Sequence, residues 1–100
     1  MFPGRTAMTD IQITDNPDRH RFEGRLDGEL AGFVVYRRDG DRLVLVHTEV
    51  DPGFEGQGVG SALARGILDQ LRAAGEVVVP QCPFIAGWIE KHPDYADLVA

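Results

Sequence analysis

Apolar and polar residues alternate along the first half of the chain, which is the pattern of strands that bury one face. The alternating segments are residues 11–13, 21–26 and 29–37. Asp27-Gly28 separates the last two segments, and this dipeptide favours a two-residue hairpin turn. We therefore expect an antiparallel meander here, preceded by a loose tail over residues 1–9, which show no periodicity.

The pattern changes in the second half of the chain. Residues 43–50 are apolar on both sides in their first half, as in a strand covered on both faces. Over residues 59–74 apolar side chains recur every four residues, as on an amphipathic helix, and Gly75 supplies a stop signal. A short β-branched strand at residues 76–79 and a second helix at residues 84–91 follow. The order predicts an α/β (α+β) fold: an antiparallel meander, then strand, glycine loop, helix, parallel strand and C-terminal helix.

The glycine loop between the strand and the helix is the most informative stretch. Gly56, Gly58 and Gly60 are spaced two residues apart. Backbone amides without side chains approach a ligand closely, and the positive end of the following helix attracts an anion. The spacing excludes two common glycine loops, because the chain lacks both the Gly-Lys-Ser/Thr of nucleoside triphosphatases and the Gly-x-Gly-x-x-Gly of dinucleotide-binding folds.

Composition narrows the class of protein. The 100 residues suffice for one small domain, which we expect over residues 10–100. Neither an apolar run long enough to span a membrane nor a secretion signal is present in the sequence, so we expect a cytoplasmic protein without a membrane partner. Cys82 is the single cysteine and there are three scattered histidines, so we expect neither a disulfide nor a metal site.

Charge bears on the partners. The formal net charge is -6 and no basic run is present, which disfavours nucleic acid. An acidic surface suits a cationic substrate such as an amine. The sequence leaves the oligomeric state open, and a monomer is compatible with it.

The glycine loop and its flanks resemble the GNAT superfamily of N-acetyltransferases, in its small single-domain branch. The acyl-CoA loop of that superfamily reads Arg/Gln-x-x-Gly-x-Gly/Ala; Gly58 and Gly60 match its small positions, and Glu55 replaces the first residue. The resemblance covers roughly residues 22–99. Three further segments carry it, namely His47-Thr48-Glu49-Val50, Pro80-Gln81-Cys82-Pro83-Phe84 and His92-Pro93-Asp94-Tyr95.

The resemblance implies that acetyl-CoA is the co-substrate and lies in a wedge where the strand before the loop splays from the strand after the helix. The loop amides would hold the pyrophosphate. The coenzyme-binding residues expected on this basis are Val50, Glu55, Gly56, Gln57, Gly58, Val59, Gly60 and Ser61. A carboxylate beside a pyrophosphate is unfavourable, so Glu55 is expected to weaken coenzyme binding.

Three residues are candidates for catalysis. His47 and Glu49 are two apart on a strand and so point to one face. One possibility is that they take the proton of an ammonium group, whose pKa is about 10 if it resembles lysine. The other is that they form a structural pair at the strand end, which fixes how far the two strands of the wedge separate. Cys82, on the opposite wall of the wedge, would accept the acyl group, protonate the leaving thiolate, or simply pack as a small apolar residue.

Other residues have weaker claims. Tyr95 would protonate the leaving thiolate or close the core, and Arg65 would reach a coenzyme phosphate or remain solvated. Phe84 and Trp88 have a helical spacing that favours the core over a substrate cage.

The sequence thus predicts an acetyl-CoA-binding protein that transfers an acetyl group to a primary amine by direct attack. Two alternatives remain open. One is a CoA-binding or protein-interaction module without efficient transfer, and the other is a thiol sensor built on Cys82.

Overall fold

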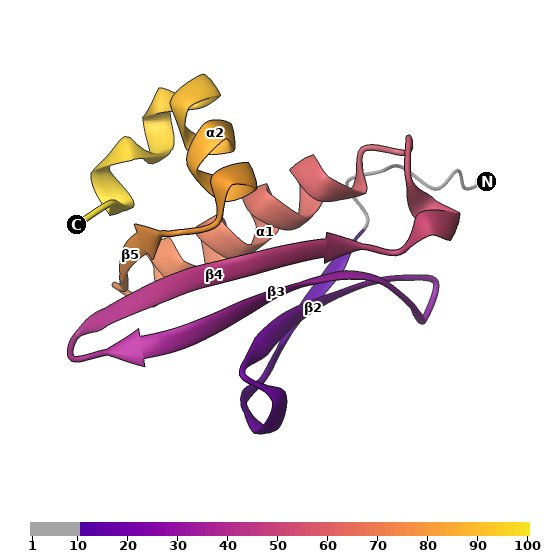
Figure 1. Ribbon diagram of the computed structural model, residues 1–100, viewed down its shortest axis with the longest axis horizontal. Coiled ribbons are helices and arrows are strands. Elements are labelled where there is room, and N and C mark those ends of the chain that lie inside the picture. The colour runs from indigo at the N-terminus through magenta and orange to yellow at the C-terminus, as the bar shows by residue number, and fades with distance from the viewer. Residues whose placement is uncertain (1–10) are drawn as a thin grey trace.

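The computed structural model describes residues 11–100, and the tail expected at residues 1–9 lies outside this range. One sheet organises the described residues, with strand order β1-β2-β3-β4-β5. The strands are β1 (Gln12–Asn16), β2 (Arg21–Leu26), β3 (Glu29–Asp39), β4 (Arg42–Val50) and β5 (Val77–Pro80). Neighbouring strands are antiparallel except for β4 and β5, which are parallel (Figure 1). The predicted α/β (α+β) architecture is therefore confirmed.

The helices follow the predicted segments closely. They are α1 (Val59–Ala73), α2 (Pro83–Lys91) and the 3₁₀ turns η2 (Pro17–Arg19), η3 (Pro52–Phe54) and η4 (Pro93–Leu98). α1 ends just before Gly75, whose φ of 73° is the left-handed conformation that commonly follows the last turn of a helix. η4 was not predicted. Pro93 ends α2, but its fixed φ also suits the first position of a new turn, and η4 begins there.

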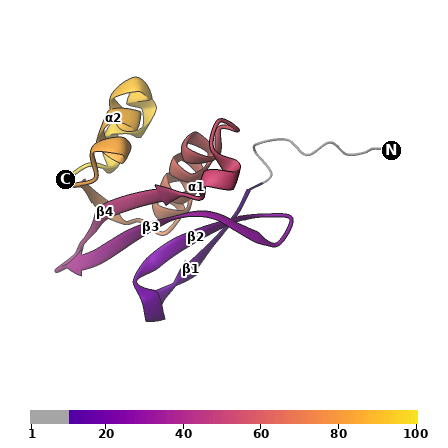
Figure 2. The ribbon, with the colours of Figure 1, turned by 45° about the vertical axis from the view of Figure 1, so that its right-hand side comes forward.

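Both α-helices lie on the same side of the sheet (Figure 2). α1 buries the apolar stripe that the sequence predicts, and α2 adds a second set of apolar side chains. The buried helical residues are Val59, Leu63, Ala64, Ile67, Leu68, Leu71, Ile85, Trp88 and Ile89. All of them except Val59 pack against sheet residues that include Phe22, Val34, Leu43, Leu45 and Val78. Val59 packs in a smaller cluster with Leu26 and Ala31. Among residues 11–100, no helix is both long and apolar enough to cross a membrane.

An irregularity in the sheet determines which way the end of β4 faces. The β3–β4 register shifts so that Val35 pairs with His47 while Tyr36 pairs with Leu45, which makes Val46 an extra residue, a β-bulge. The bulge shifts by one residue which side chains of β4 face the helices. Leu45, before the bulge, faces the helices. Thr48, after the bulge, faces them too, as its contact with Cys82 requires. His47 therefore faces the side of the sheet that α1 and α2 leave open.

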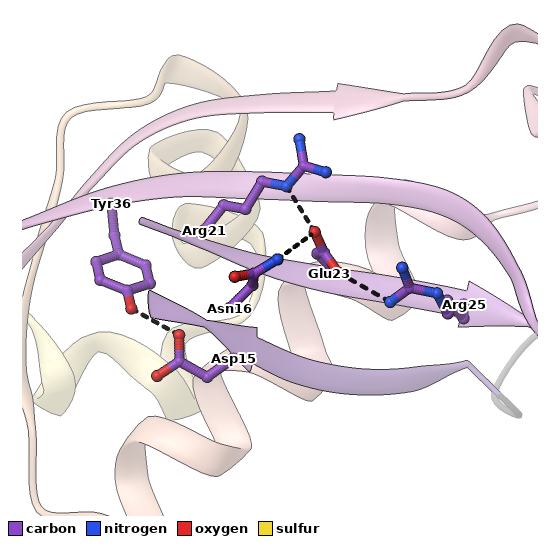
Figure 3. A network of polar contacts seen from close by, with 6 residues as sticks. All are labelled: Asp15, Asn16, Arg21, Glu23, Arg25 and Tyr36. Carbon is purple, nitrogen blue, oxygen red and sulfur yellow. Dashed lines mark hydrogen bonds and ion pairs between the residues drawn. The ribbon is translucent and has the colours of Figure 1, made fainter. Parts of the chain in front are cut away.

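That open face carries a compact ion network on β1 and β2 (Figure 3). Glu23 accepts hydrogen bonds from Arg21 at 2.8 Å, Arg25 at 2.9 Å and Asn16 at 3.1 Å. These side chains leave Glu23 only 5% exposed. The hydrogen bond from Arg21 is the main reason why the pKa of Glu23 is lowered to about 2. Arg21 also lies over the ring of Phe33 on β3, at 4.3 Å from its centroid.

Candidate functional site

The sheet opens at the end of β4. The β4–β5 ladder stops at the pair Leu45–Pro80, and the N–H of Cys82 still donates to the Leu45 carbonyl at 2.9 Å. β4 itself continues to Val50, so within the described chain residues 46–50 have no strand beside them on that edge. The two segments separate there and form a wedge, bounded by β4 on one side and by the start of α2 on the other.

The glycine loop closes the wide end of this wedge. The loop begins at Asp51, whose carboxylate accepts a hydrogen bond from the N–H of Gly53 at 2.8 Å and so caps η3. Gly56 and Gly58 have φ of 82° and 77°. A residue with a side chain adopts this left-handed conformation only at a cost in free energy. Gly58 is the N-cap of α1, no side chain caps the helix, and its first turn contains no acidic residue.

The first turn of α1 therefore presents free donors. The first backbone bond into the helix joins the N–H of Ala62 to the carbonyl of Gly58 at 3.1 Å. By helix geometry the N–H groups of Val59, Gly60 and Ser61 have no acceptor within the helix. Together with the helix dipole, N–H groups in this position are able to attract an anion, which is the chemistry that the predicted coenzyme site requires.

The expected coenzyme residues fall into two groups. The side chain of Val59 is buried in a small apolar cluster on which the partly buried Val50 packs, so Val59 offers only its backbone atoms to a ligand. The Gln57 amide donates to the Gly53 carbonyl at 3.4 Å, which leaves its backbone N–H as the relevant group. Ser61 Oγ accepts the Trp88 indole N–H at 2.9 Å and keeps its own hydroxyl proton to donate. Glu55 is exposed and forms no ion pair within residues 11–100.

Phe84 corrects the sequence analysis, which placed it in the core. It is 43% exposed, because the first turn of α2 directs it outward over the first turn of α1. A Cβ built on Gly60 would come within 2.9 Å of its Cζ. The absence of a side chain at Gly60 therefore makes room for an aromatic ring as well as for a ligand, and only the packing of α2 on α1 reveals this.

His47 and Glu49 form the predicted pair. His47 Nε2 lies 3.0 Å from Glu49 Oε2, and the two side chains are 56% and 59% exposed. If Nε2 carries the proton and donates it to Glu49, Nδ1 keeps a lone pair that can accept a proton. The pair lies on the open face of β4.

Cys82 lies on the helical side of β4 and is only 4% exposed. Its Sγ is 3.2 Å from Thr48 Oγ1. Burial raises the pKa of the Cys82 thiol, but hydrogen bonds from the Thr48 hydroxyl and from the N–H groups of Ile85 and Phe84 lower it, and the net pKa is below the ordinary value. The structure thus brings Cys82 to the wedge but on the other side of β4 from His47.

A small hollow of about 130 Å³ adjoins Glu49. It is lined by Leu30, Gly32, Phe33, Glu49, Val50, Asp51 and Pro52. Sequence reasoning missed it, because the registers of β2, β3 and β4 depend on two bulges, one in the β3–β4 ladder and one in the β2–β3 ladder. The second bulge lies where Gly24 pairs with Gly32 but Arg25 pairs with Leu30.

Tyr95 and Arg65 contact each other and not the wedge. The Tyr95 hydroxyl donates to Asp69 at 2.7 Å and accepts from Arg65 at 3.1 Å. Burial is the main reason why the pKa of Tyr95 is raised. Trp88 stacks on His92 at 3.8 Å between ring centroids. These residues therefore fasten η4 and α2 to α1. Within residues 11–100, no three His, Cys, Asp or Glu side chains converge as a metal site would require.

Comparison with known proteins supplies the family. A model of the GCN5-related N-acetyl-transferases matches residues 21–98. The solution NMR structure of a GCN5-like protein from Staphylococcus aureus superposes with a TM-score of 0.66, covering 89% of this chain and 87% of that chain at 23% sequence identity. No curated protein matches the chain. Because the family model spans most of the chain, the protein belongs to the GCN5-related N-acetyltransferase family.

Proposed function

We propose that the protein binds acetyl-CoA and transfers its acetyl group to a primary amine. The observation that carries the proposal is the uncapped first turn of α1, which lies at the mouth of the wedge between β4 and α2. A pyrophosphate needs several donors that are already oriented, and this turn offers them without competing acidic side chains of its own.

The coenzyme would bind with its pyrophosphate on the backbone amides of Gln57, Gly58, Val59 and Gly60. Ser61 adds a hydroxyl proton that its bond from Trp88 leaves free. The pantetheine arm would then enter the wedge beside residues 46–50 and bring the thioester toward Cys82.

Acetyl transfer requires a neutral amine. His47 Nδ1 would take a proton from the ammonium group, while Glu49 holds the imidazole through Nε2. The amine nitrogen then bonds to the thioester carbonyl carbon, the carbon–sulfur bond breaks, and its electron pair leaves with the CoA sulfur. Cys82 lines the acyl pocket, and its lowered pKa makes it a suitable donor of a proton to that sulfur. The proton that the acetylated nitrogen then loses would restore the Cys82 thiol, so the products are a neutral amide and the CoA thiol.

The hollow beside Glu49 fits the acceptor. Two carboxylates, Glu49 and Asp51, lie on its wall, and Phe33 adds an aromatic surface. This chemistry suits an alkylammonium group, and the net charge of -6 favours the approach of a cation.

Titration with acetyl-CoA and with CoA, followed by backbone amide shifts, tests the coenzyme site. We expect shifts centred on residues 56–62 that Gly58→Glu abolishes. Gly75→Glu is the matched control, because it places the same side chain on a positive-φ glycine at the opposite end of α1. Absence of binding by the unmodified protein at millimolar ligand would refute the proposal.

A second candidate is a CoA-binding module without efficient transfer. The exposed Glu55 next to the loop and the high exposure of His47 favour it, because a base in contact with bulk water acts without the exclusion of solvent that aids many enzymes. An assay for CoA release over a broad panel of amines separates the two. Turnover supports the transferase, whereas tight CoA binding without turnover supports the module.

A further inference from the structure

The acceptor hollow beside Glu49 lies on a sheet face that carries opposite charges on two strands. The carboxylates in its lining come from Glu49 in β4 and from Asp51 just after β4, and other lining residues belong to β3. On the far side of β3, β2 carries two arginines, Arg21 and Arg25, around the single carboxylate of Glu23. The face therefore has an excess of negative charge along β4 and an excess of positive charge along β2.

The strand register places one of these arginines in the same row as the candidate base. Arg21 pairs with Val35 in the β2–β3 ladder, and Val35 pairs with His47 in the β3–β4 ladder. In the next row Phe33 pairs with Glu49. Because neighbouring strands lie about 4.8 Å apart, the backbones of β2 and β4 are separated here by about 10 Å.

Arg21 is held in place, yet most of its hydrogen-bonding capacity is unused. Its Nε donates to Glu23 at 2.8 Å, and its guanidinium carbon lies 4.3 Å from the centroid of the Phe33 ring, which also lines the hollow. Within residues 11–100, neither of its two terminal nitrogens donates a hydrogen bond, and the side chain remains 19% exposed. Figure 3 shows both nitrogens on the side of the guanidinium that faces away from Glu23. Two such nitrogens match the two oxygens of a carboxylate.

The needs of Glu23 do not account for a second arginine. Its Oε1 accepts a hydrogen bond from Arg25 and its Oε2 accepts one from Asn16. One arginine suffices to neutralise one carboxylate, so Arg21 leaves a net positive charge on this strand. In a chain whose net charge is -6, a fixed positive charge beside the acceptor hollow favours a ligand that carries a negative group.

We propose that the acceptor is a zwitterion, an ω-amino carboxylate whose amine lies at His47 and Glu49 and whose carboxylate is bound by Arg21. The inference rests on the proposed function and names the substrate class of its acceptor site. Since the two binding groups belong to strands about 10 Å apart, several carbon atoms must separate the amine from the carboxylate.

The test uses δ-aminovalerate, its primary amide and pentylamine, which share one chain length and differ at the end remote from the amine. Each is titrated into the CoA-loaded protein, followed by backbone amide shifts, and each is assayed with acetyl-CoA for CoA release. We expect δ-aminovalerate to bind about tenfold more tightly than the other two, with a kcat/KM higher by the same factor, because its carboxylate gains charge-assisted hydrogen bonds. Glycine should have no advantage over methylamine, because its carboxylate lies too close to its amine to reach Arg21.

Variants of Arg21 test the assignment of the carboxylate. Arg21→Gln should remove the preference, and the loss should appear in KM with little change in kcat, because the contact is remote from the reacting atoms. Arg21→Lys should restore only part of the preference, since an ammonium group cannot form the paired contact. Arg19→Gln is the matched control, because it removes the same charge from an exposed position in η2, and it should retain the full preference.

The outcomes separate this inference from the proposed function. If the unmodified protein turns over pentylamine and the amide as well as δ-aminovalerate, only the zwitterionic acceptor is refuted, and this comparison holds even if Arg21→Gln fails to fold. If CoA binds and no amine is turned over, the transferase function falls, and the dissociation constants still show whether the hollow selects the zwitterion. Absence of binding by all three amines refutes the inference. A preference that survives in folded Arg21→Gln refutes the role of Arg21.

Discussion

The pKa of the Cys82 thiol depends on residues that are distant in the sequence as well as on its neighbours. Pro83 signals a helix start just after it, and the structure supplies the N–H groups of Phe84 and Ile85 as partners for the sulfur. Thr48, 34 residues earlier, completes the set from β4. No local pattern identifies Thr48, because the β-bulge at Val46 is what turns it toward the helices.

Thr48→Val is expected to raise the pKa of the Cys82 thiol, since the hydroxyl is the leading group that lowers it. The rate of alkylation by iodoacetamide follows the thiolate fraction, so the midpoint of its pH profile reports the pKa. In the unmodified protein the midpoint should lie below that of an ordinary cysteine, about 8.5. In Thr48→Val it should move to higher pH. An identical profile in both proteins would show that Thr48 has no influence on the thiol.

Glu55 offers a second test at this scale. Because a carboxylate next to a pyrophosphate repels it, Glu55→Gln should tighten acetyl-CoA binding, by about fivefold for an exposed charge. The effect should shrink at high salt, since exposed charges are screened. Asp18→Gln, in η2 on the N-terminal side of β2, removes an equivalent exposed charge away from the loop and should change nothing. Weaker binding by Glu55→Gln would mean that Glu55 assists the site.

At the scale of elements, the sequence predicts those parts that local chemistry determines. Asp27-Gly28 turns the β2–β3 hairpin, and the stripe of α1 and its stop at Gly75 are read directly from spacing. The pairing between strands is different. Whether a strand carries an extra residue depends on its partner, so the bulge at Val46, which orients the candidate base, is visible only in the assembled sheet.

Three glycines within the α-helices should respond differently to the same substitution by alanine. Each gains about 1 kcal/mol of helix propensity. Gly87→Ala should raise the Tm, because nothing opposes the gain. Gly60→Ala should leave it nearly unchanged, since the exposed Phe84 ring moves aside. Gly66→Ala should lower it, because Ile13 is part of β1, and overpacking there costs about 1–3 kcal/mol.

Thermal denaturation measures all three variants under one condition. The expected order of Tm is Gly87→Ala highest, then the unmodified protein and Gly60→Ala, then Gly66→Ala. A Gly66→Ala variant as stable as Gly87→Ala would show that β1 adapts freely to α1.

At the scale of the whole molecule, the sheet is asymmetric. α1 and α2 cover one face (Figure 2). The other face carries the pair His47 and Glu49, and also the network around Glu23 that Figure 3 shows. An exposed sheet face usually alternates simple polar side chains. Here two arginines instead bury a carboxylate between them, which fixes β2 at the rim of the face where the acceptor hollow opens.

Acid titration tests how much this network stabilises the fold. The folded-state pKa of Glu23, about 2, is below its ordinary value of 4.5, so its contribution is fully present above pH 4.5 and is lost as the pH falls toward 2. Glu23→Gln removes the charge that Arg21 and Arg25 bind, and should lower the free energy of unfolding at pH 7 by about 1–3 kcal/mol.

Urea denaturation at pH 7, 4.5 and 3 compares the two proteins while the other carboxyl groups titrate equally in both. The difference in free energy of unfolding should hold between pH 7 and 4.5 and shrink at pH 3, because protonation of Glu23 in the unfolded chain then competes with folding. Glu90→Gln, an exposed charge on α2, should show no such convergence. A constant difference at every pH would mean that Glu23 stabilises β2 through its shape and hydrogen bonds, without its charge.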